Sequence, residues 1–136
     1  MIPFLNADQI RNALPYPVLI DALRVAFQGD TQTPQRHVHT LDQQGNTLLI
    51  MPAWQPQRKL GVKLVTVAPG NPARQLPTLH SVFILFDADT GMPIALLDGE
   101  QLTLRRTAAA SALASSYLSR ADSKTLLVVG TGQLAP

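Results

Sequence analysis

The sequence predicts an α+β fold, in which an antiparallel or mixed sheet is flanked by helices. Two observations support this class. The middle of the 136-residue chain contains apolar, strand-like runs joined by short turns, and too few helical segments separate them to connect parallel strands. Apolar residues recur at helical spacing on either side of this region, at 18–27 and 100–118.

Two helices are predicted at the start of the chain. Asn6 or Asp8 can cap a short helix that ends near Ala13, because a side-chain oxygen there accepts a hydrogen bond from an unpaired backbone amide. A second helix is predicted over 18–27, and Gly29 ends it. The apolar stripe of this second helix is expected to cover a core.

The next predicted elements are strands, at 36–41, 47–51, 60–67, 81–86 and 93–97. Polar and apolar residues alternate in the first of them, as in a strand with one buried face. A turn at 43–46 joins the first two strands into a hairpin, and a turn at 87–91 precedes the last strand.

A long helix is predicted from about Glu100 to Leu118. Its buried stripe is expected to contain Leu104, Ala108, Ala112 and Leu118. Arg105 and Arg106 lie in its early turns, where the helix dipole disfavours cations unless an anion is present. Adjacent side chains on a helix point about 100° apart, so at most one of these arginines enters a given pocket.

The end of the chain predicts the entry to a dinucleotide-binding unit. An apolar strand at 125–129 runs directly into Gly130, Gly132, Gln133, Leu134 and Ala135, which have the spacing G-x-G-x-x-A. The sequence stops at Pro136, before the helix and the acidic residue that would hold the ribose, so we interpret it as a fragment or a truncated gene product. The predicted domains are 1–123, which binds substrate, and 124–136, which opens a Rossmann domain.

Composition excludes several functions. The net charge is only +2 and the basic residues are scattered, so we expect no nucleic-acid partner. Because the chain has no cysteine, and its three histidines lack acidic partners at ligand spacing, no metal site is expected. There is no signal pattern, and no apolar run approaches the roughly 18 residues of a membrane span, so we expect a cytoplasmic protein without membrane contact.

Lys63 is the anomaly of the predicted strands, because a lysine among valine and leucine must find a partner, a ligand or a wet cavity for its charge. Two interpretations are open. Lys63 can be an edge-strand lysine whose ammonium reaches solvent, or it can belong to a functional pocket.

Several motifs together resemble the ornithine cyclodeaminase and mu-crystallin family, in its order and spacing. They are Gly61-Val62-Lys63-Leu64-Val65-Thr66, Pro69-Gly70-Asn71-Pro72, Leu76-Pro77-Thr78, Asp87-Ala88-Asp89-Thr90-Gly91, Leu97-Asp98-Gly99 and Arg105-Arg106-Thr107-Ala108-Ala109-Ala110-Ser111. The resemblance implies an NADPH- or NADH-dependent oxidoreductase and a homodimer.

The resemblance also implies roles for four residues. Arg36 and Arg106 are expected to grip a substrate carboxylate, Lys63 to be catalytic near the reacting carbon and nitrogen, and Thr78 to bind the substrate or the lysine. A lysine desolvated near two arginines should have a lowered pKa, which suits proton exchange with an imine near neutrality. Thr78 can equally bond only to backbone at the start of its strand.

The implied reaction is reduction of Δ1-pyrroline-2-carboxylate or Δ1-piperideine-2-carboxylate to proline or pipecolate. One alternative is NAD-dependent ornithine cyclodeamination, although Lys63 is followed by Leu64-Val65-Thr66, which is closer to the reductase and crystallin members. The other is a non-catalytic, crystallin-like binder of a small ligand. The 136-residue chain by itself is expected to be inactive, because nearly all of the nucleotide-binding unit lies outside it.

Overall fold

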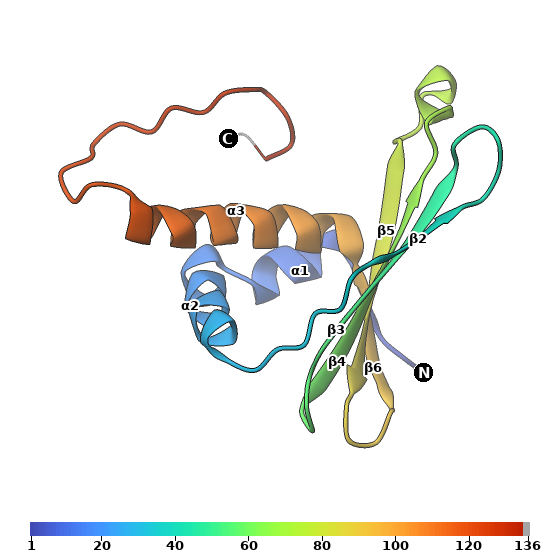
Figure 1. Ribbon diagram of the computed structural model, residues 1–136, viewed down its shortest axis with the longest axis horizontal. Helices are drawn as coiled ribbons and strands as arrows, with labels where there is room; N and C mark the ends of the chain where they lie inside the picture. Colours follow the sequence, from blue (N-terminus) through green and yellow to red (C-terminus); the bar gives the residue numbers. More distant parts are fainter. Residues whose placement is uncertain (135–136) are drawn as a thin grey trace.

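A computed structural model describes residues 1–134, which form a six-stranded mixed sheet with three α-helices on one of its faces (Figure 1). The elements in chain order are β1 (Phe4–Leu5), α1 (Ala7–Ala13), α2 (Tyr16–Gln28), β2 (His37–Thr40), β3 (Thr47–Gln55), β4 (Lys59–Val67), the 3-10 helix η1 (Asn71–Arg74), β5 (Leu79–Asp87), β6 (Pro93–Asp98) and α3 (Gly99–Leu118). The predicted α+β class is therefore confirmed.

The two N-terminal helices are confirmed, together with their end signals. Asn6 caps α1 through a capping box, in which its side chain accepts from the Gln9 amide and the Gln9 side chain accepts from the Asn6 amide. Helix α2 begins two residues earlier than predicted, directly after Pro15, and ends at Gly29. Pro17 fits the first turn of this helix because the amide it lacks has no partner there.

The strands follow the order β1-β6-β5-β4-β3-β2. Strands β2 to β6 form antiparallel neighbours joined by short connections, as predicted. Strand β1 is an unpredicted element that pairs in parallel with β6, with Phe4 opposite Leu96. This pair makes the sheet mixed. The sequence did not predict β1, because a strand of two residues has no local sequence pattern and its partner strand lies about 90 positions away.

Strand β3 continues through Pro52, whereas the prediction stopped at Met51. Trp54 exchanges backbone hydrogen bonds with Gln32 on the outer side of β3. Because residues two apart face the same side of a strand, the nitrogen of Pro52 also faces this outer side. Strand β2 pairs with β3 only as far as Ile50, so proline removes no ladder hydrogen bond here.

Helix α3 is confirmed, but its predicted buried stripe is shifted. Ala109 and Leu113 are buried, whereas Ala112 and Leu118 are exposed. The buried face of a helix is set by the elements that it touches, and α3 rests on α1, α2 and β5. Apolar spacing within a helix rich in small residues does not specify that direction.

The predicted strand at 125–129 is wrong for this chain. These residues have no strand structure, and Leu126 and Val129 are 82% and 90% exposed. A strand needs neighbouring backbone to satisfy its amides and carbonyls, and none of the strands within residues 1–134 lies beside this segment. The segment instead turns back over α3 (Figure 1). The division into domains at residues 123 and 124 stays a prediction.

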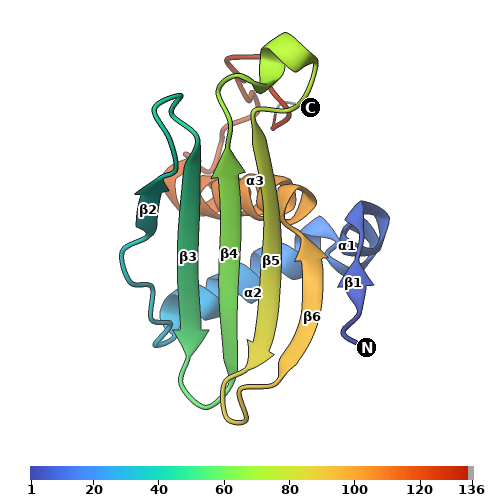
Figure 2. The same cartoon turned by 90° about the vertical axis from the view of Figure 1, so that its right-hand side faces the viewer.

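The face of the sheet that points away from the helices is apolar and open, and Figure 2 looks onto it. Gly61 and Val65 of β4 are buried on the helix side, so by alternation Leu60, Val62 and Leu64 point to the other face. Neighbouring residues that share this open face are Leu48, Ile50, Val82, Ile84 and Phe86, all half-buried. Within residues 1–134, none of the helices combines the length and apolarity that a membrane crossing requires.

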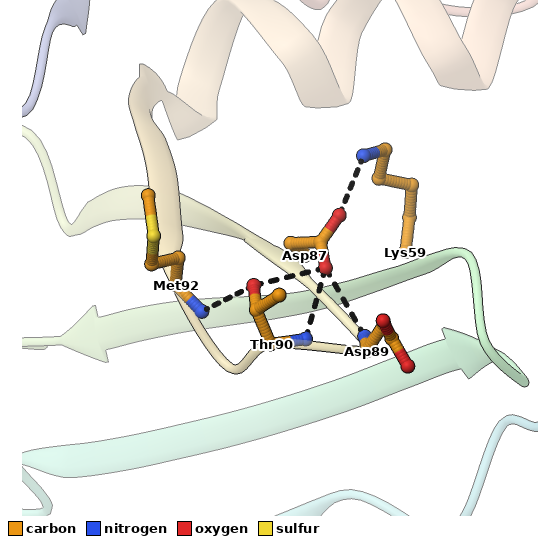
Figure 3. Close-up of polar contacts among 5 residues, drawn as sticks. All are labelled: Lys59, Asp87, Asp89, Thr90 and Met92. Atoms are coloured by element: carbon orange, nitrogen blue, oxygen red, sulfur yellow. Dashed lines mark hydrogen bonds and ion pairs between the residues drawn. The ribbon is translucent and has the colours of Figure 1, made fainter.

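Asp87 organises the turn between β5 and β6 (Figure 3). One of its oxygens accepts from the amide of Thr90 at 3.0 Å, the hydroxyl of Thr90 at 3.0 Å and the amide of Asp89 at 3.2 Å. The other accepts from Nζ of Lys59 at 3.3 Å. The hydrogen bonds from Thr90, then the one from Lys59, lower the pKa of Asp87 from 3.8 to about 2.

We predict that Asp87→Asn destabilises the fold at neutral pH and that this effect disappears in acid. Because the pKa of Asp87 is lower in the folded than in the unfolded chain, its stabilisation is complete well above pH 3.8 and is lost as the pH falls toward 2. Urea denaturation at pH 7 and pH 2 measures the difference between the variant and the unmodified chain. Asp89→Asn is the matched control, and a difference for Asp87→Asn that does not change with pH would contradict the account.

Candidate functional site

Lys63 lies in a central strand and points toward α3. Strand β4 has β3 on one side and β5 on the other, so the edge-strand interpretation of Lys63 is wrong. Its ammonium donates a hydrogen bond of 2.5 Å to Oγ1 of Thr103, on the second turn of α3. The side chain is half-buried, on the same face of the sheet as the buried Gly61 and Val65.

The electrostatics of this site disfavour the charged form of the lysine. Burial lowers the pKa of Lys63 from its usual 10.5, and the charge of Arg106 lowers it further. A lowered pKa makes an ammonium a better proton donor near neutral pH.

A cavity of about 410 Å³ opens beside the Lys63 ammonium. It is lined by Lys63, Pro77, Thr78, Leu79, Glu100, Thr103, Leu104 and Gln133. The volume lies within the range of small-molecule sites. Polar residues of four types share the lining, namely a lysine, two threonines, a glutamate and a glutamine. Thr78 therefore lies in the same cavity as Lys63, which brings two of the predicted site residues together.

The two adjacent arginines of α3 have different surroundings. Nε of Arg105 donates a 2.7 Å hydrogen bond to the Leu14 carbonyl, and its guanidinium lies 4.2 Å from the centre of the Tyr16 ring. Arg105 therefore joins α3 to the segment between α1 and α2. Arg106 is exposed and near enough to Lys63 to lower its pKa, so it is the arginine available to a ligand.

Arg36 lies two strands away from Lys63 across the sheet. It is exposed and comes immediately before β2. His37 pairs with Ile50, and Met51 pairs with Lys63, so Arg36 is level with Lys63 but two strands away. Two strand spacings amount to about 10 Å. A ligand beside Lys63 would have to bridge that gap to be held by Arg36.

The glycine loop lies close to the Lys63 cavity. Gly130 has φ of +110°, a conformation that side chains with a Cβ rarely adopt, and Gln133 lines the cavity. Leu134 and Leu126 line a second cavity, together with small side chains of α3. Ala135, the last residue of the predicted cofactor loop, lies outside the described residues. The cofactor-binding roles of these residues stay predictions.

Thr103 and Glu100 are site residues that sequence reasoning missed. Thr103 stands one helical turn after Gly99 and three residues before Arg106, so both neighbours lie on nearly the same face of α3. That spacing would have placed Thr103 beside any lysine close to Arg106. Glu100 lies in the first turn of α3 and lines the cavity. This turn is capped by Asp98, whose side chain accepts from the Gln101 amide at 2.7 Å.

Comparison with known proteins shows the family. The model of the ornithine cyclodeaminase/mu-crystallin family matches residues 8–136. The chain belongs to this family. The predicted resemblance is thereby confirmed, and family membership accounts for the motifs around Lys63, Thr78 and Arg106.

Relatives with known names extend over nearly the whole chain. The Δ1-pyrroline-2-carboxylate/Δ1-piperideine-2-carboxylate reductase of Azospirillum brasilense is 40% identical over 139 residues, covering 98% of this chain and 44% of the relative. Δ1-pyrroline-2-carboxylate reductase of Thermococcus litoralis, solved with NADH and L-proline, is 30% identical, with a TM-score of 0.78 over 90% of this chain and 40% of that one. A lysine cyclodeaminase structure is 31% identical, with a TM-score of 0.77 over 98% of this chain and 43% of its own. The chain thus spans less than half the length of these relatives.

We predict that replacing Arg105 destabilises the fold more than replacing Arg106. Arg105→Ala should lower the free energy of unfolding by about 1 to 3 kcal/mol, because it removes a charged hydrogen bond and a cation–π contact. Arg106→Ala is the matched control and should stay within about 0.5 kcal/mol, as is usual for an exposed side chain. Urea denaturation of the two variants gives both values. Equal losses would contradict the structural assignment of Arg105.

Proposed function

We propose that this chain is the substrate-binding part of an oxidoreductase that uses NADPH or NADH to reduce small cyclic imino acids, Δ1-pyrroline-2-carboxylate and Δ1-piperideine-2-carboxylate, to proline and pipecolate. In this proposal residues 1–123 bind the imino acid, and residues 124–136 open the nucleotide-binding domain. The observation that carries it is the half-buried Lys63 in a cavity that Gln133 of the glycine loop also lines. Cytoplasmic location is part of the same proposal.

The glycine loop of this chain leaves space in which a pyrophosphate could approach the backbone. A Cβ at Gly130 or Gly132 would meet nothing within 4 Å, so the backbone there is open to a ligand. Backbone amides in such a loop suit phosphate oxygens. Bound nicotinamide would supply the hydride for the imine carbon.

The residues of this chain would supply orientation and a proton. Arg106 would hold the substrate carboxylate, with the side chain of Arg36, which precedes β2, reaching about two strand spacings to the same group, and this would fix the adjacent imine carbon in the cavity. Lys63 would donate a proton to the imine nitrogen as that nitrogen gains an electron pair. Thr78, which lines the cavity, would bond to the ring nitrogen or to the lysine.

One observation favours ornithine cyclodeamination as a second candidate. Glu100 lines the Lys63 cavity, and its carboxylate could hold the side-chain ammonium of a diamino acid. A cyclic imino acid has no such ammonium. The two candidates therefore differ in whether Glu100 contributes to substrate binding.

We predict that the 136-residue chain alone does not oxidise NADH or NADPH with any imino acid. A glycine loop without a following helix lacks the ordered amides that hold a pyrophosphate. Joining the chain to the part of the Azospirillum relative that lies beyond the matched region should give reduction of Δ1-pyrroline-2-carboxylate, measured by the loss of NADH or NADPH absorbance. If the joined enzyme released ammonia from ornithine and left the imino acid unreduced, the reductase proposal would be wrong.

We predict that Lys63→Met in this joined enzyme lowers kcat by about 10² to 10⁴-fold, as loss of a general acid does, and removes one limb of the pH–rate profile. KM should change less than kcat, because the carboxylate is held by arginine. Lys59→Met is the matched control, since Lys59 is in the same strand but pairs with Asp87. Near-normal kcat with an unchanged pH profile for Lys63→Met would end the catalytic assignment.

We predict that the chain forms a homodimer through the open face of the sheet. Strands β3, β4 and β5 have nine residues each and are about 30 Å long, and with the shorter β2 and β6 they make a face on the order of 600 Å². Stable interfaces bury about 800 Å² per partner, and a symmetric pair would cover this apolar surface. Val62→Glu, near the centre of the face, should give a monomer in sedimentation, whereas Gln43→Glu, in an exposed turn, should not. An unmodified chain that is monomeric at micromolar concentration would contradict the proposal.

A further inference from the structure

Thr103 connects the Lys63 ammonium to the backbone of α3. Its Oγ1 accepts from Nζ of Lys63 at 2.5 Å and donates to the carbonyl of Gly99 at 2.5 Å. A hydroxyl has one proton, and here that proton is directed to Gly99. Toward Lys63 the hydroxyl therefore offers only lone pairs, which accept most strongly from a charged donor.

Gly99, whose carbonyl accepts the hydrogen bond from Thr103, is held in place by close contact with β5. A Cβ on Gly99 would lie 2.6 Å from the backbone carbon of Ser81 in β5, so the first turn of α3 is pressed against the sheet. Asp98 caps the same turn by accepting from the Gln101 amide. Because Gly99 cannot shift, the direction of the Thr103 hydroxyl is set by the contact between helix and sheet.

The surroundings of Lys63 otherwise oppose its charge or leave it unpaired. Its partners in the neighbouring strands are Met51 and Phe83, which offer no acceptor of comparable strength. The charged groups on the elements around it include Arg106 and Glu100 of α3 and Arg36 before β2, while Arg105 of α3 is bonded to the Leu14 carbonyl and Asp87 of β5 pairs with Lys59 of β4. Among the described residues, the hydrogen bond to Thr103 is the one that Lys63 makes through its side chain.

We propose that Thr103 is a positioning residue that holds the Lys63 ammonium toward the cavity, with one N–H bond fixed on Oγ1 and the other two left for the substrate. An ammonium has three N–H bonds on a flexible four-carbon stem, so a single strong acceptor removes much of its rotational freedom. The same acceptor favours the protonated amine, which opposes the effects of burial and of Arg106. The catalytic consequence rests on the proposed reductase function, whereas the positioning does not.

The direct test is nuclear magnetic resonance of the chain with labelled lysine, because the sequence contains only three lysines, at positions 59, 63 and 124. The signal that disappears in Lys63→Met identifies Lys63. Thr103→Val keeps the branched shape but removes the acceptor, and it should lower the pKa of Lys63 by about one unit, a tenfold change in proton affinity. Thr103→Ser keeps the hydroxyl and should leave the pKa within about 0.3 of a unit.

Thr107→Val is the matched control, because Thr107 lies one turn further along α3 and lines a different cavity. It should not change the Lys63 titration. An unchanged or raised pKa of Lys63 in Thr103→Val would overturn the proposal, and Thr103→Ala provides the same test if the valine variant does not fold.

Kinetics of the joined enzyme form the second arm. Thr103→Val should lower kcat about 10- to 100-fold with little change in KM, and Thr103→Ser should restore it. If Lys63→Met leaves kcat normal while Thr103→Val still shifts the Lys63 pKa, the catalytic role of Lys63 fails and the positioning role stands. If the joined enzyme does not reduce the imino acid while the pKa still shifts, the reductase function fails and the positioning role stands. If the pKa does not move, the positioning role fails whatever the kinetics.

Discussion

The arrangement of the site depends on the close contact between the first turn of α3 and β5. Gly99 lies so near Ser81 that a methyl group there would overlap its backbone. This contact fixes the helix at one place on the sheet. Thr103 and Arg106 follow on the same helix, so their distances from Lys63 on the neighbouring strand are set by it. A helix that began with alanine would have to move outward, and the acceptor for Lys63 would move with it.

Burying half of a lysine in a central strand desolvates its ammonium, which destabilises the folded chain and is not needed for folding. Leucine or methionine at this position would pack among Val65, Met51 and Phe83 without any desolvation of charge. Proteins retain such groups at functional sites, where stability is given up for chemistry. The pKa of Lys63 is lowered because burial and Arg106 disfavour its charged form. Its ammonium also borders a cavity that could hold a ligand.

Local signals in the sequence were sufficient for most of the fold. The cap at Asn6, the stop at Gly29 and the turn at Asp87 are each determined by residues within one turn of chain. Features set by distant partners were missed. Strand β1 exists because β6 is beside it, and residues 125–129 have no strand structure because no strand among residues 1–134 pairs with them.

The same distinction applies to the candidate site. Family motifs selected Lys63, Thr78 and Arg106, and the structure places Thr78 in the Lys63 cavity and Arg106 close enough to affect its pKa. Spacing could not decide between Arg105 and Arg106, because the decision depends on Leu14 and Tyr16, which come about 90 residues earlier. The central position of β4 was likewise invisible before the strand order was known.

The measurement that tests the account most directly is a crystal structure of the chain with pyrrole-2-carboxylate, a stable planar analogue of the proposed imino acid. The account predicts the carboxylate on Arg106 and the ring nitrogen within hydrogen-bond distance of the Lys63 ammonium, with Thr103 still bonded to that ammonium. Binding of the analogue in the groove between α2 and α3 beside Arg24 and Tyr117, with the Lys63 cavity left empty, would contradict it.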